Sequence, residues 1–343
     1  MSLSPQKLIA GPCSAETRGQ TIATAEALKG LGIKYFRAGL WKPRSRPGSF
    51  EGVGAEGLEW LREVKDRFAM KVCTEVATPL HAELCLKAGV DILWVGARTT
   101  ANPFQVQELA EALRGCGVPV LVKNPPSHDI ALWLGALERL QAAGTGRLAA
   151  VLRGVPSSEK IPYRNAPDWE LAVEMRTRLP ELPVFADPSH IAGGTAYIKE
   201  ISQRALDLGF DGLMIESHID PSSALSDPGQ QLTPAELGVL LASLQGRDAS
   251  SPDERFLREL EALRARMDVA DEDLIAALAA RMKLSAQIGA LKKEHKVAII
   301  QTARWEKVLS RAESLAREYG LDPEAARGVF DAVHEASIKE QNR

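Results

Sequence analysis

Residues 212–232 read GLMIESHIDPSSALSDPGQQL and join a short apolar run to a loop that carries two acidic side chains. The apolar run has the length and composition of a buried strand, and Glu216 follows it directly. Asp227 comes eleven residues later, in a stretch rich in Pro, Gly and Ser that is typical of a loop. The segment therefore predicts a buried strand that delivers two carboxylates to its C-terminal end, where barrel enzymes place their active sites.

Two other strand-like runs end in side chains that are common metal ligands. PVFADPSH carries His190 beyond an apolar strand, and LIAGPCS places Cys13 at the end of a third strand. Each residue has an ordinary explanation when taken singly: a buried thiol, a helix cap, a turn carboxylate. Their shared position after separate strands instead predicts that Cys13, His190, Glu216 and Asp227 meet on one divalent cation. Mixed S, N and O ligands suit zinc or another borderline transition metal better than magnesium.

Eight short apolar runs, each followed by a longer amphipathic segment, predict the architecture of residues 1–245. The intervening segments, such as residues 57–67 and 104–114, have apolar residues at the three-and-four spacing of helices. Eight strand–helix units in this length match a (β/α)8 TIM barrel. A doubly wound open sheet is the alternative, but no GxGxxG follows the first strand. The candidate strands begin near Leu8, Ile33, Lys71, Ile92, Val118, Leu148, Val184 and Leu213.

The sequence changes character after the expected barrel. Residues 246–253 are polar and turn-rich, which predicts a linker. Residues 254–295 contain no proline and predict one helix of about 40 residues, roughly 60 Å long. Such a helix is expected to pair with another helix or with a second chain. Two further helices are expected at residues 303–319 and 323–341, so residues 254–343 form an all-helical domain, which we expect to be an intertwined homodimer.

Composition indicates a water-soluble protein without a nucleic-acid partner. The 343 residues are 45% hydrophobic and 25% charged, which suits one large domain and a small second one. The net charge of -3 offers no general attraction for nucleic acid. Four cysteines without a CxxC pair favour a reducing cytoplasm. We find no charged-then-apolar leader and no apolar run near eighteen residues, so we expect neither a signal peptide nor a membrane span.

Positive charge follows several of the expected strands. A solvated loop position is the ordinary explanation for each Lys or Arg taken alone. Gathered on one rim of an acidic protein, they form a collar that would bind phosphate and carboxylate groups. Their number predicts two anionic substrates or one with several charges. They are Arg37, Lys42 and Arg44 after the second strand, Arg98 after the fourth, Lys123 after the fifth and Arg153 after the sixth.

Motifs throughout residues 8–235 resemble those of 3-deoxy-D-arabino-heptulosonate 7-phosphate (DAHP) synthases of the type I beta-like group. The resemblance implies the condensation of phosphoenolpyruvate with D-erythrose 4-phosphate, the first step of the shikimate pathway to aromatic amino acids. The matching motifs are GPCS at 11–14, RAGLWKPRS at 37–45, VGARTT at 95–100, DPSHIAGG at 187–194, and IES with ALSDPGQQL at 215–232.

The resemblance also implies roles for individual residues. One divalent metal ion (Mn, Fe, Co or Zn) would be held by Cys13, His190, Glu216 and Asp227. Phosphoenolpyruvate would be held by Arg98, Lys123 and Arg153. The aldehyde substrate and its phosphate would be reached by Lys42 and Arg44, with Lys42 placed to supply a proton to the developing alkoxide.

The helical tail resembles the all-α chorismate mutases in LRARMDVADEDLIAALAARMKLSAQIGALK at 263–292 and EASIKEQ at 335–341. The resemblance implies conversion of chorismate to prephenate. Arg281 and Lys292 are eleven residues apart, about 20 degrees off alignment on a helix, so they point the same way. Arg264 lies roughly 100 degrees from Arg281 by the same rule, and in the family the partner subunit supplies the matching arginine. The implied substrate ligands are Arg264, Arg281, Lys292, Arg304, Ser337 and Gln341, with Gln341 near the ether oxygen.

Two other interpretations remain open. In the first interpretation, the barrel acts on another sugar phosphate, as the related octulosonate synthases do. The KPRS motif differs from their KANRSS-like stretch and argues against it. The tail serves only for dimerisation and sensing in the second, as a long helix with solvated cations. The chain starts almost at the first strand, so we expect the N-terminal regulatory extension of many relatives to be absent. We therefore expect the helical domain to mediate feedback inhibition by prephenate or chorismate.

Overall fold

The structure is a computed structural model that describes residues 8–42, 48–158, 160–247 and 250–342. The chain forms two units, Met1–Ala249 and Ser250–Arg343. The division between them falls inside the segment 246–253 that was expected as a linker, whose bounds stay a prediction. Arg44, expected to contact substrate, lies outside the described residues.

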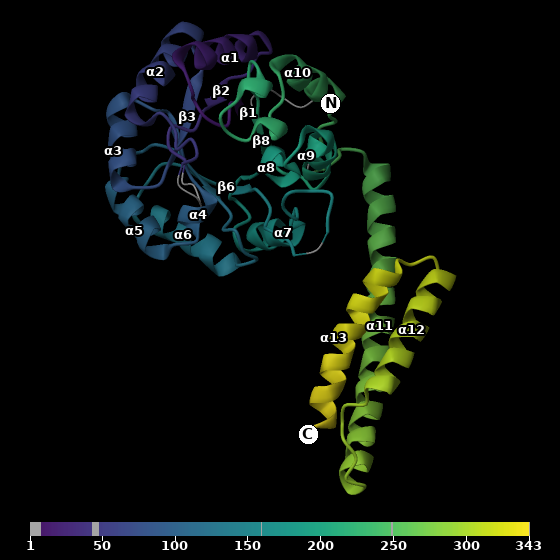
Figure 1. The fold of residues 1–343 in the computed structure, drawn as a ribbon. Coiled ribbons are helices and arrows are strands. Elements are labelled where there is room, and N and C mark those ends of the chain that lie inside the picture. The colour runs from purple at the N-terminus through teal and green to yellow at the C-terminus, as the bar shows by residue number, and fades with distance from the viewer. Residues whose placement is uncertain (1–7, 43–47, 159, 248–249, 343) are drawn as a thin grey trace. The chain divides into compact units, whose positions relative to one another are not determined.

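Eight parallel strands in chain order form a closed barrel in the first unit, because β1 pairs with both β2 and β8 (Figure 1). The predicted (β/α)8 barrel is thus confirmed. Ile9, Trp94 and Met214 belong to a buried apolar cluster that is separate from the larger core beneath the helices. The strands are buried almost throughout, which explains why they read as continuous apolar runs. They are β1 (Leu8–Gly11), β2 (Tyr35–Arg37), β3 (Lys71–Val76), β4 (Ile92–Val95), β5 (Val120–Lys123), β6 (Leu148–Leu152), β7 (Val184–Ala186) and β8 (Gly212–Glu216).

Two strands begin later than the apolar runs predict. Strand β2 starts at Tyr35, where its register with Lys71 begins, although Ile33 before it is already fully buried. Strand β5 likewise starts at Val120, whose partner is Leu93. The apolar run marks burial, whereas the strand requires hydrogen bonds to a neighbour, so the run overestimates its length.

Several helices of the barrel unit begin at side-chain caps. Thr78 precedes Pro79 and accepts a hydrogen bond from the backbone of His81, and Thr233 forms a capping box with Glu236. These two caps fix where the loops before α3 and α10 end. The helices are α1 (Arg18–Gly30), α2 (Gly57–Phe68), α3 (Pro79–Ala88), α4 (Ala97–Thr100), α5 (Pro103–Ala112), α6 (Ile130–Ala142), α7 (Trp169–Arg178), α8 (Pro188–Ala192), α9 (Ile198–Asp207) and α10 (Pro234–Ser243), with 3₁₀ turns at Gly54–Glu56, Thr195–Tyr197, Pro221–Ser223 and Pro228–Gln230.

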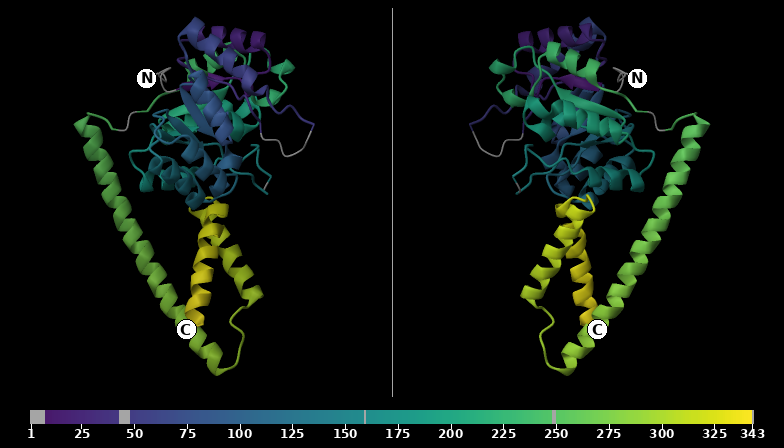
Figure 2. Two further views of the ribbon diagram at one scale, coloured as in Figure 1. Left: turned by 90° about the vertical axis from the view of Figure 1, so that its left-hand side faces the viewer. Right: turned by 90° about the vertical axis from the view of Figure 1, so that its right-hand side faces the viewer.

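The second unit consists of three helices, α11 (Glu254–Glu294), α12 (Thr302–Glu318) and α13 (Pro323–Gln341). Helix α13 packs against both others, and Figure 2 shows these contacts from two sides. Helices α11 and α13 approach closely at Gly289, where an added Cβ would meet the backbone of Gln341 at 2.5 Å. Only Ser285 and Gly289 are buried among the described residues of α11. Most of the longest helix therefore lacks a packing partner within one chain.

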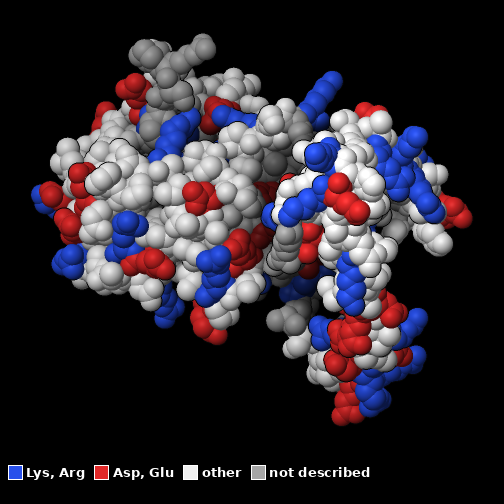
Figure 3. Space-filling model, turned by 90° about the horizontal axis from the view of Figure 1, so that it is seen from below, with Lys and Arg blue, Asp and Glu red and all other residues white. Residues whose placement is uncertain are grey.

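By length and composition alone, helix α11 is apolar enough to span a membrane. The charged residues Arg281 and Lys283 interrupt its apolar sequence, so it contains no continuous apolar run near eighteen residues. On the face of the barrel unit seen in Figure 3, basic and acidic side chains are interspersed rather than gathered by sign.

Candidate active site

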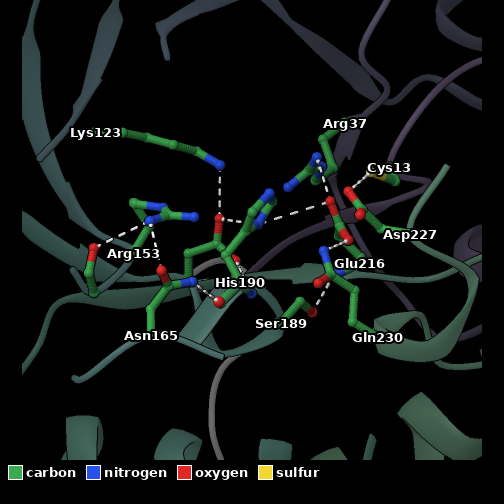
Figure 4. Close-up of polar contacts among 12 residues, drawn as sticks. Cys13, Arg37, Lys123, Arg153, Asn165, Ser189, His190, Glu216, Asp227 and Gln230 are labelled. Carbon is green, nitrogen blue, oxygen red and sulfur yellow. Dashed lines mark hydrogen bonds and ion pairs between the residues drawn. The ribbon is translucent and has the colours of Figure 1, made fainter. Parts of the chain in front are cut away.

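A cavity of about 410 Å³ opens at the C-terminal ends of the barrel strands. Every strand from β2 to β8 contributes a lining residue from its end or from the loop that follows it. Figure 4 shows the polar side chains that converge there. The sequence predicted this rim as the site. The lining residues are Lys42, Glu75, Gly96, Ala97, Arg98, Lys123, Pro126, Arg153, Pro156, Arg164, Asn165, His190 and Asp227.

Cys13 and Asp227 form one pair on this rim. The thiol is fully buried and donates a hydrogen bond to Asp227 Oδ2 at 3.3 Å. Burial and the charge of Glu216 raise the pKa of Cys13 to about 12, so it stays a thiol at pH 7 unless a cation stabilises the thiolate. Burial alone would raise the pKa of Asp227, but Lys42 and Arg164 lower it to about 2.

His190 and Glu216 form a second pair, with His190 Nδ1 3.8 Å from Glu216 Oε1. Asp187 Oδ2 lies 2.8 Å from the same nitrogen without forming a hydrogen bond to it, and Asp187 Oδ1 accepts from the His190 backbone N–H. Burial lowers the pKa of His190 and favours the neutral ring, the form that binds metals. Burial would raise the pKa of Glu216, but the positive charges of Arg37 and Lys42 hold it below its usual value.

Lys42 lies beside the first pair, Cys13 and Asp227. Its Nζ contacts Cys13 Sγ and is 3.9 Å from Asp227 Oδ2. Burial would lower the pKa of Lys42, but the neighbouring Cys13, Glu216 and Asp227 raise it, so the ammonium stays charged. The structure thus places this predicted residue beside the proposed metal ligands.

Arg37 contacts the carboxylate of Glu216 from inside the barrel. It is 1% exposed, and its Nη2 donates to Glu216 Oε1 at 3.0 Å. The guanidinium carbon lies 4.9 Å from the centre of the Trp94 ring, a cation–π contact. Its Nε and Nη1 are buried and have no hydrogen-bond partner among the described residues. Such donors are costly to leave unpaired, and Arg37 is not among the residues that line the cavity.

The predicted cations reach the cavity from different loops. Lys123 donates to Asp187 Oδ2 at 2.7 Å and also lies over the Trp94 ring. Arg153 is held by Asn165, whose side-chain oxygen accepts from its Nη1 at 3.2 Å. Arg98 follows β4 and lines the same space. The structure therefore brings Arg98, Lys123 and Arg153 together as the sequence predicted, with three positive charges facing one cavity.

Several residues of the site were not predicted as functional. Arg164 donates to Asp227 Oδ1 at 3.2 Å, and Asn165 donates to the His190 carbonyl at 2.7 Å. Both lie in the loop before α7, where no sequence pattern marks them. A sequence pattern could have marked Asp187. An Asp followed by Pro is typical of a helix start, and Asp187 caps the backbone N–H of His190 there.

The four predicted metal ligands lie on the same rim as two pairs. Among the residues that the structure describes, no three His, Cys, Asp or Glu side chains are gathered closely enough to hold an ion. The chemistry of the donors nevertheless fits a borderline divalent metal, since a thiol, a neutral imidazole and two carboxylates are present. Their enclosure of one ion stays a prediction.

Four of the six predicted residues of the helical unit form two separate contacts between α11 and α13. Arg281 on α11 contacts the Ser337 hydroxyl on α13, and Lys292 donates to Gln341 Oε1 at 3.2 Å. Arg281 and Lys292 thus both face α13, as their spacing predicts. Arg264 is exposed on α11 with its guanidinium 3.9 Å from Glu261. Arg304 is exposed on α12.

The barrel and its cavity define a (β/α)8 protein with a cation-rich site at the strand ends, joined to an all-helical unit. Residues 4–249 match the model of the DAHP synthetase I family, and the chain belongs to this family. Residues 263–342 match the model of chorismate mutase type II. Both matches confirm the resemblances found in the sequence.

Similar proteins carry two kinds of name. The chain is 36% identical to a phospho-2-dehydro-3-deoxyheptonate aldolase of Thermotoga maritima over 66% of its own length, and it spans 64% of that relative. It is 28% identical to a 2-dehydro-3-deoxyphosphooctonate aldolase of Dichelobacter nodosus over 75% of its length and 95% of that protein. A crystal structure of the Thermotoga maritima DAHP synthase superposes with a TM-score of 0.62 at 32% identity, covering 69% of this chain and 67% of the other.

Proposed function

We propose that the barrel unit condenses phosphoenolpyruvate with D-erythrose 4-phosphate to DAHP, the first step of the shikimate pathway. The family match over residues 4–249 carries this proposal. Greater identity to the heptonate aldolase than to the octonate aldolase favours a four-carbon over a five-carbon aldehyde. The cavity supports two anionic substrates, because Arg98, Lys123 and Arg153 face a space of about 410 Å³.

A divalent metal ion (Mn, Fe, Co or Zn) is proposed to be held by Cys13, His190, Glu216 and Asp227. When bound, it would polarise the aldehyde carbonyl as a Lewis acid. The thiol of Cys13 needs such a cation to ionise at pH 7, since burial raises its pKa to about 12. Asp187 lies beside the imidazole of His190, in the position from which outer carboxylates commonly orient metal-binding histidines.

The remaining side chains bind and orient the reactants. Lys123 and Arg153 hold the phosphate and carboxylate of phosphoenolpyruvate, with Arg98 beside them. Lys42, charged and buried, stabilises the negative charge that develops on the aldehyde oxygen and supplies a proton to it. Arg44 is proposed to hold the aldehyde's phosphate. C3 of phosphoenolpyruvate forms a bond to the aldehyde carbon, water adds at C2, and phosphate leaves.

Replacing His190 by Ala tests the metal-dependent part. We expect stripped and metal-reconstituted His190→Ala protein to consume phosphoenolpyruvate no faster than the metal-free wild type. The control is His295→Ala, which removes a histidine at the end of α11 and leaves the barrel unchanged. An unchanged rate in His190→Ala, with the metal removed and restored, would rule out the proposed role.

The helical unit is proposed to convert chorismate to prephenate. Arg281 contacts Ser337 and Lys292 contacts Gln341 across the α11–α13 interface, and these two contacts support a dicarboxylate site between the helices. Arg264 and Arg304 are proposed to complete it, with Arg264 coming from a second chain.

A homodimer through α11 is proposed on separate grounds. Large apolar side chains on α11 are more than half exposed in one chain, including Met267, Leu274 and Ile275. Large apolar side chains exposed along one helix are expected to be covered by a partner surface. The same pattern accounts for its membrane-like composition, so we propose a cytoplasmic protein, with the apolar face in a dimer rather than in a bilayer.

Feedback inhibition is proposed to operate through the helical unit. It is joined to the barrel by a short segment, which keeps the two sites at high effective concentration. Binding of prephenate or chorismate to the helical unit would then lower condensation activity, and coupling of about 1 to 3 kcal/mol is enough for useful inhibition.

A further inference from the structure

The dipeptide Gln230–Gln231 lies directly behind the strand-end site. Both side chains are only 1% exposed, although amides are costly to bury without hydrogen bonds. The next residue, Leu232, is tied to the end of β8, because its N–H donates to the Glu216 carbonyl and its carbonyl accepts from His218. The backbone beside Gln231 is thus fixed to the strand that carries Glu216.

The Gln231 side chain joins two loops that follow different strands. Its Oε1 accepts from the Cys13 backbone N–H at 2.9 Å, after β1. Its Nε2 donates to the Ser226 carbonyl at 2.9 Å, in the loop after β8. Ser226 directly precedes Asp227. One side chain therefore spans from Cys13 to the neighbour of Asp227.

The Gln230 side chain makes the corresponding contacts on the other pair. Its Nε2 donates to Glu216 Oε2 at 2.7 Å (Figure 4). Its Oε1 accepts from Arg164 at 3.0 Å. The same Arg164 nitrogen donates to Asp227 Oδ1. Each side-chain oxygen and nitrogen of the two glutamines thus has a hydrogen-bond partner. These partners belong to Cys13 and Glu216, or lie next to Asp227 or contact it.

Asp227 needs such support because its backbone is in the left-handed region, with φ of +45°, which a non-glycine residue rarely adopts. Its position is set on one side by Ser226, which Gln231 holds. On the other side the N–H of Gln230 donates to the Asp227 carbonyl. The loop conformation that turns the Asp227 carboxylate toward Cys13 is therefore held by hydrogen bonds on both sides of Asp227.

We propose that Gln231 is a positioning residue that sets the spacing of Cys13 and Asp227. Gln230 is likewise a positioning residue, which holds the carboxylate of Glu216. This inference rests on the proposed metal site. The glutamines touch no substrate; they act by holding the donors ready for an ion. The site then loses affinity for metal when the glutamines are removed, even if every donor remains.

Cobalt titration of the metal-free protein tests this directly, since thiolate-to-cobalt absorption reports Cys13 as a ligand without turnover. Gln231→Met keeps the side-chain length and removes both hydrogen bonds. We expect its cobalt affinity to fall about 10- to 100-fold, the usual effect of losing an outer contact. Gln231→Glu keeps the acceptor for Cys13 and loses the donor to Ser226, so its cobalt affinity is expected to lie between those of wild type and Gln231→Met.

Gln203→Met is the matched control. Gln203 also donates and accepts hydrogen bonds, with Gln245 and Asp207, but on α9 away from the cavity. Its cobalt affinity is expected to equal that of wild type, and thermal unfolding of each variant shows whether the barrel is folded. Wild-type affinity in Gln231→Met and Gln231→Glu would overturn the inference and leave the metal site intact. No thiolate absorption in the wild type would overturn the metal site and the inference with it.

Discussion

Buried charged pairs set the chemistry of the barrel at the level of single residues. Lys123 with Asp187 and Arg37 with Glu216 are each less than 5% exposed, so neither partner is solvated by water. Removing one member of such a pair costs roughly 3 to 5 kcal/mol, because the other charge is left buried alone. The intact pairs therefore fix the positions of these charges, although a buried pair by itself adds little to stability.

Arg281→Ala tests the assignment of the helical site. Arg281 contacts Ser337, and its loss removes a charged contact to a substrate carboxylate worth about 1.5 to 3 kcal/mol. We expect kcat/KM for chorismate to fall roughly 10- to 150-fold on that scale. Phosphoenolpyruvate consumption should be unchanged. The control is Arg266→Ala, an exposed arginine on the same helix.

If both activities fell together in folded Arg281→Ala protein, the two units would not hold independent sites.

The sequence predicted the metal ligands but not the side chains that contact them. Cys13, His190 and Glu216 lie at or shortly after strand ends, so strand position alone places them on one rim. The role of Arg164 depends on contacts with residues 63 and 66 positions away in the chain, at Asp227 and Gln230. No local pattern encodes a contact of that range, and the same holds for the arrangement of the four ligands as two pairs.

Loops between elements carry the next level of organisation. His128 after β5 and Asp168 before α7 are joined by a contact of 2.8 Å between Nδ1 and Oδ2. Asp168 has a positive φ of +53°, so its loop holds a conformation that a non-glycine residue rarely adopts. The pair ties together two loops that lead to Lys123 and Arg153. Sequence predicted the elements on either side but not this contact between their loops.

The His128–Asp168 contact predicts a pH-dependent stability. Asp168 raises the pKa of His128, so the folded state binds the proton more tightly than the unfolded state. The stabilisation is fully present below the ordinary histidine pKa of 6.5 and is lost as pH rises through the higher folded value. Urea unfolding between about pH 5.5 and pH 8.5, a range that brackets this titration, should show a steeper loss for wild type than for His128→Asn.

Equal slopes for the two proteins would show that the contact contributes no proton-linked stability.

The exposed face of α11 predicts the oligomeric state. Leu274 is 54% exposed, and a charge there is expected to break a dimer that buries it. We expect wild type to sediment as a dimer or a multiple of it, and Leu274→Glu to shift toward monomer. Val239→Glu is the control, because Val239 is 73% exposed on α10 in the barrel unit. A monomeric wild type at micromolar concentration would contradict the assignment of α11 to an interface.

At the scale of the whole molecule, two units with separate family matches share one chain. Sequence composition located the change between them because Pro- and Gly-containing strand–helix units give way to a proline-free helix. Communication between the units is not encoded in such a pattern, since it depends on binding free energies at two sites. It is therefore the part of the account that most needs measurement.

Prephenate is predicted to inhibit condensation by the intact chain. The inhibition should be lost in a chain that ends near Gly246, and also in full-length Arg281→Ala, which keeps the helices but weakens the ligand contact. Linkage requires that the barrel's substrates weaken prephenate binding by the same factor. Equal inhibition of the intact and shortened chains, or none in the intact chain, would exclude the helical unit as the sensor.

The central claim is that the barrel joins phosphoenolpyruvate to a four-carbon aldehyde at a metal-dependent strand-end site. The most direct measurement is phosphoenolpyruvate consumption by metal-reconstituted full-length protein with erythrose 4-phosphate, beside the same assay with a five-carbon sugar phosphate and after chelation. The account predicts rapid consumption with erythrose 4-phosphate, much slower consumption with the longer sugar, and loss of activity on chelation that added metal restores. Preference for the five-carbon sugar, or full activity after chelation, would contradict it.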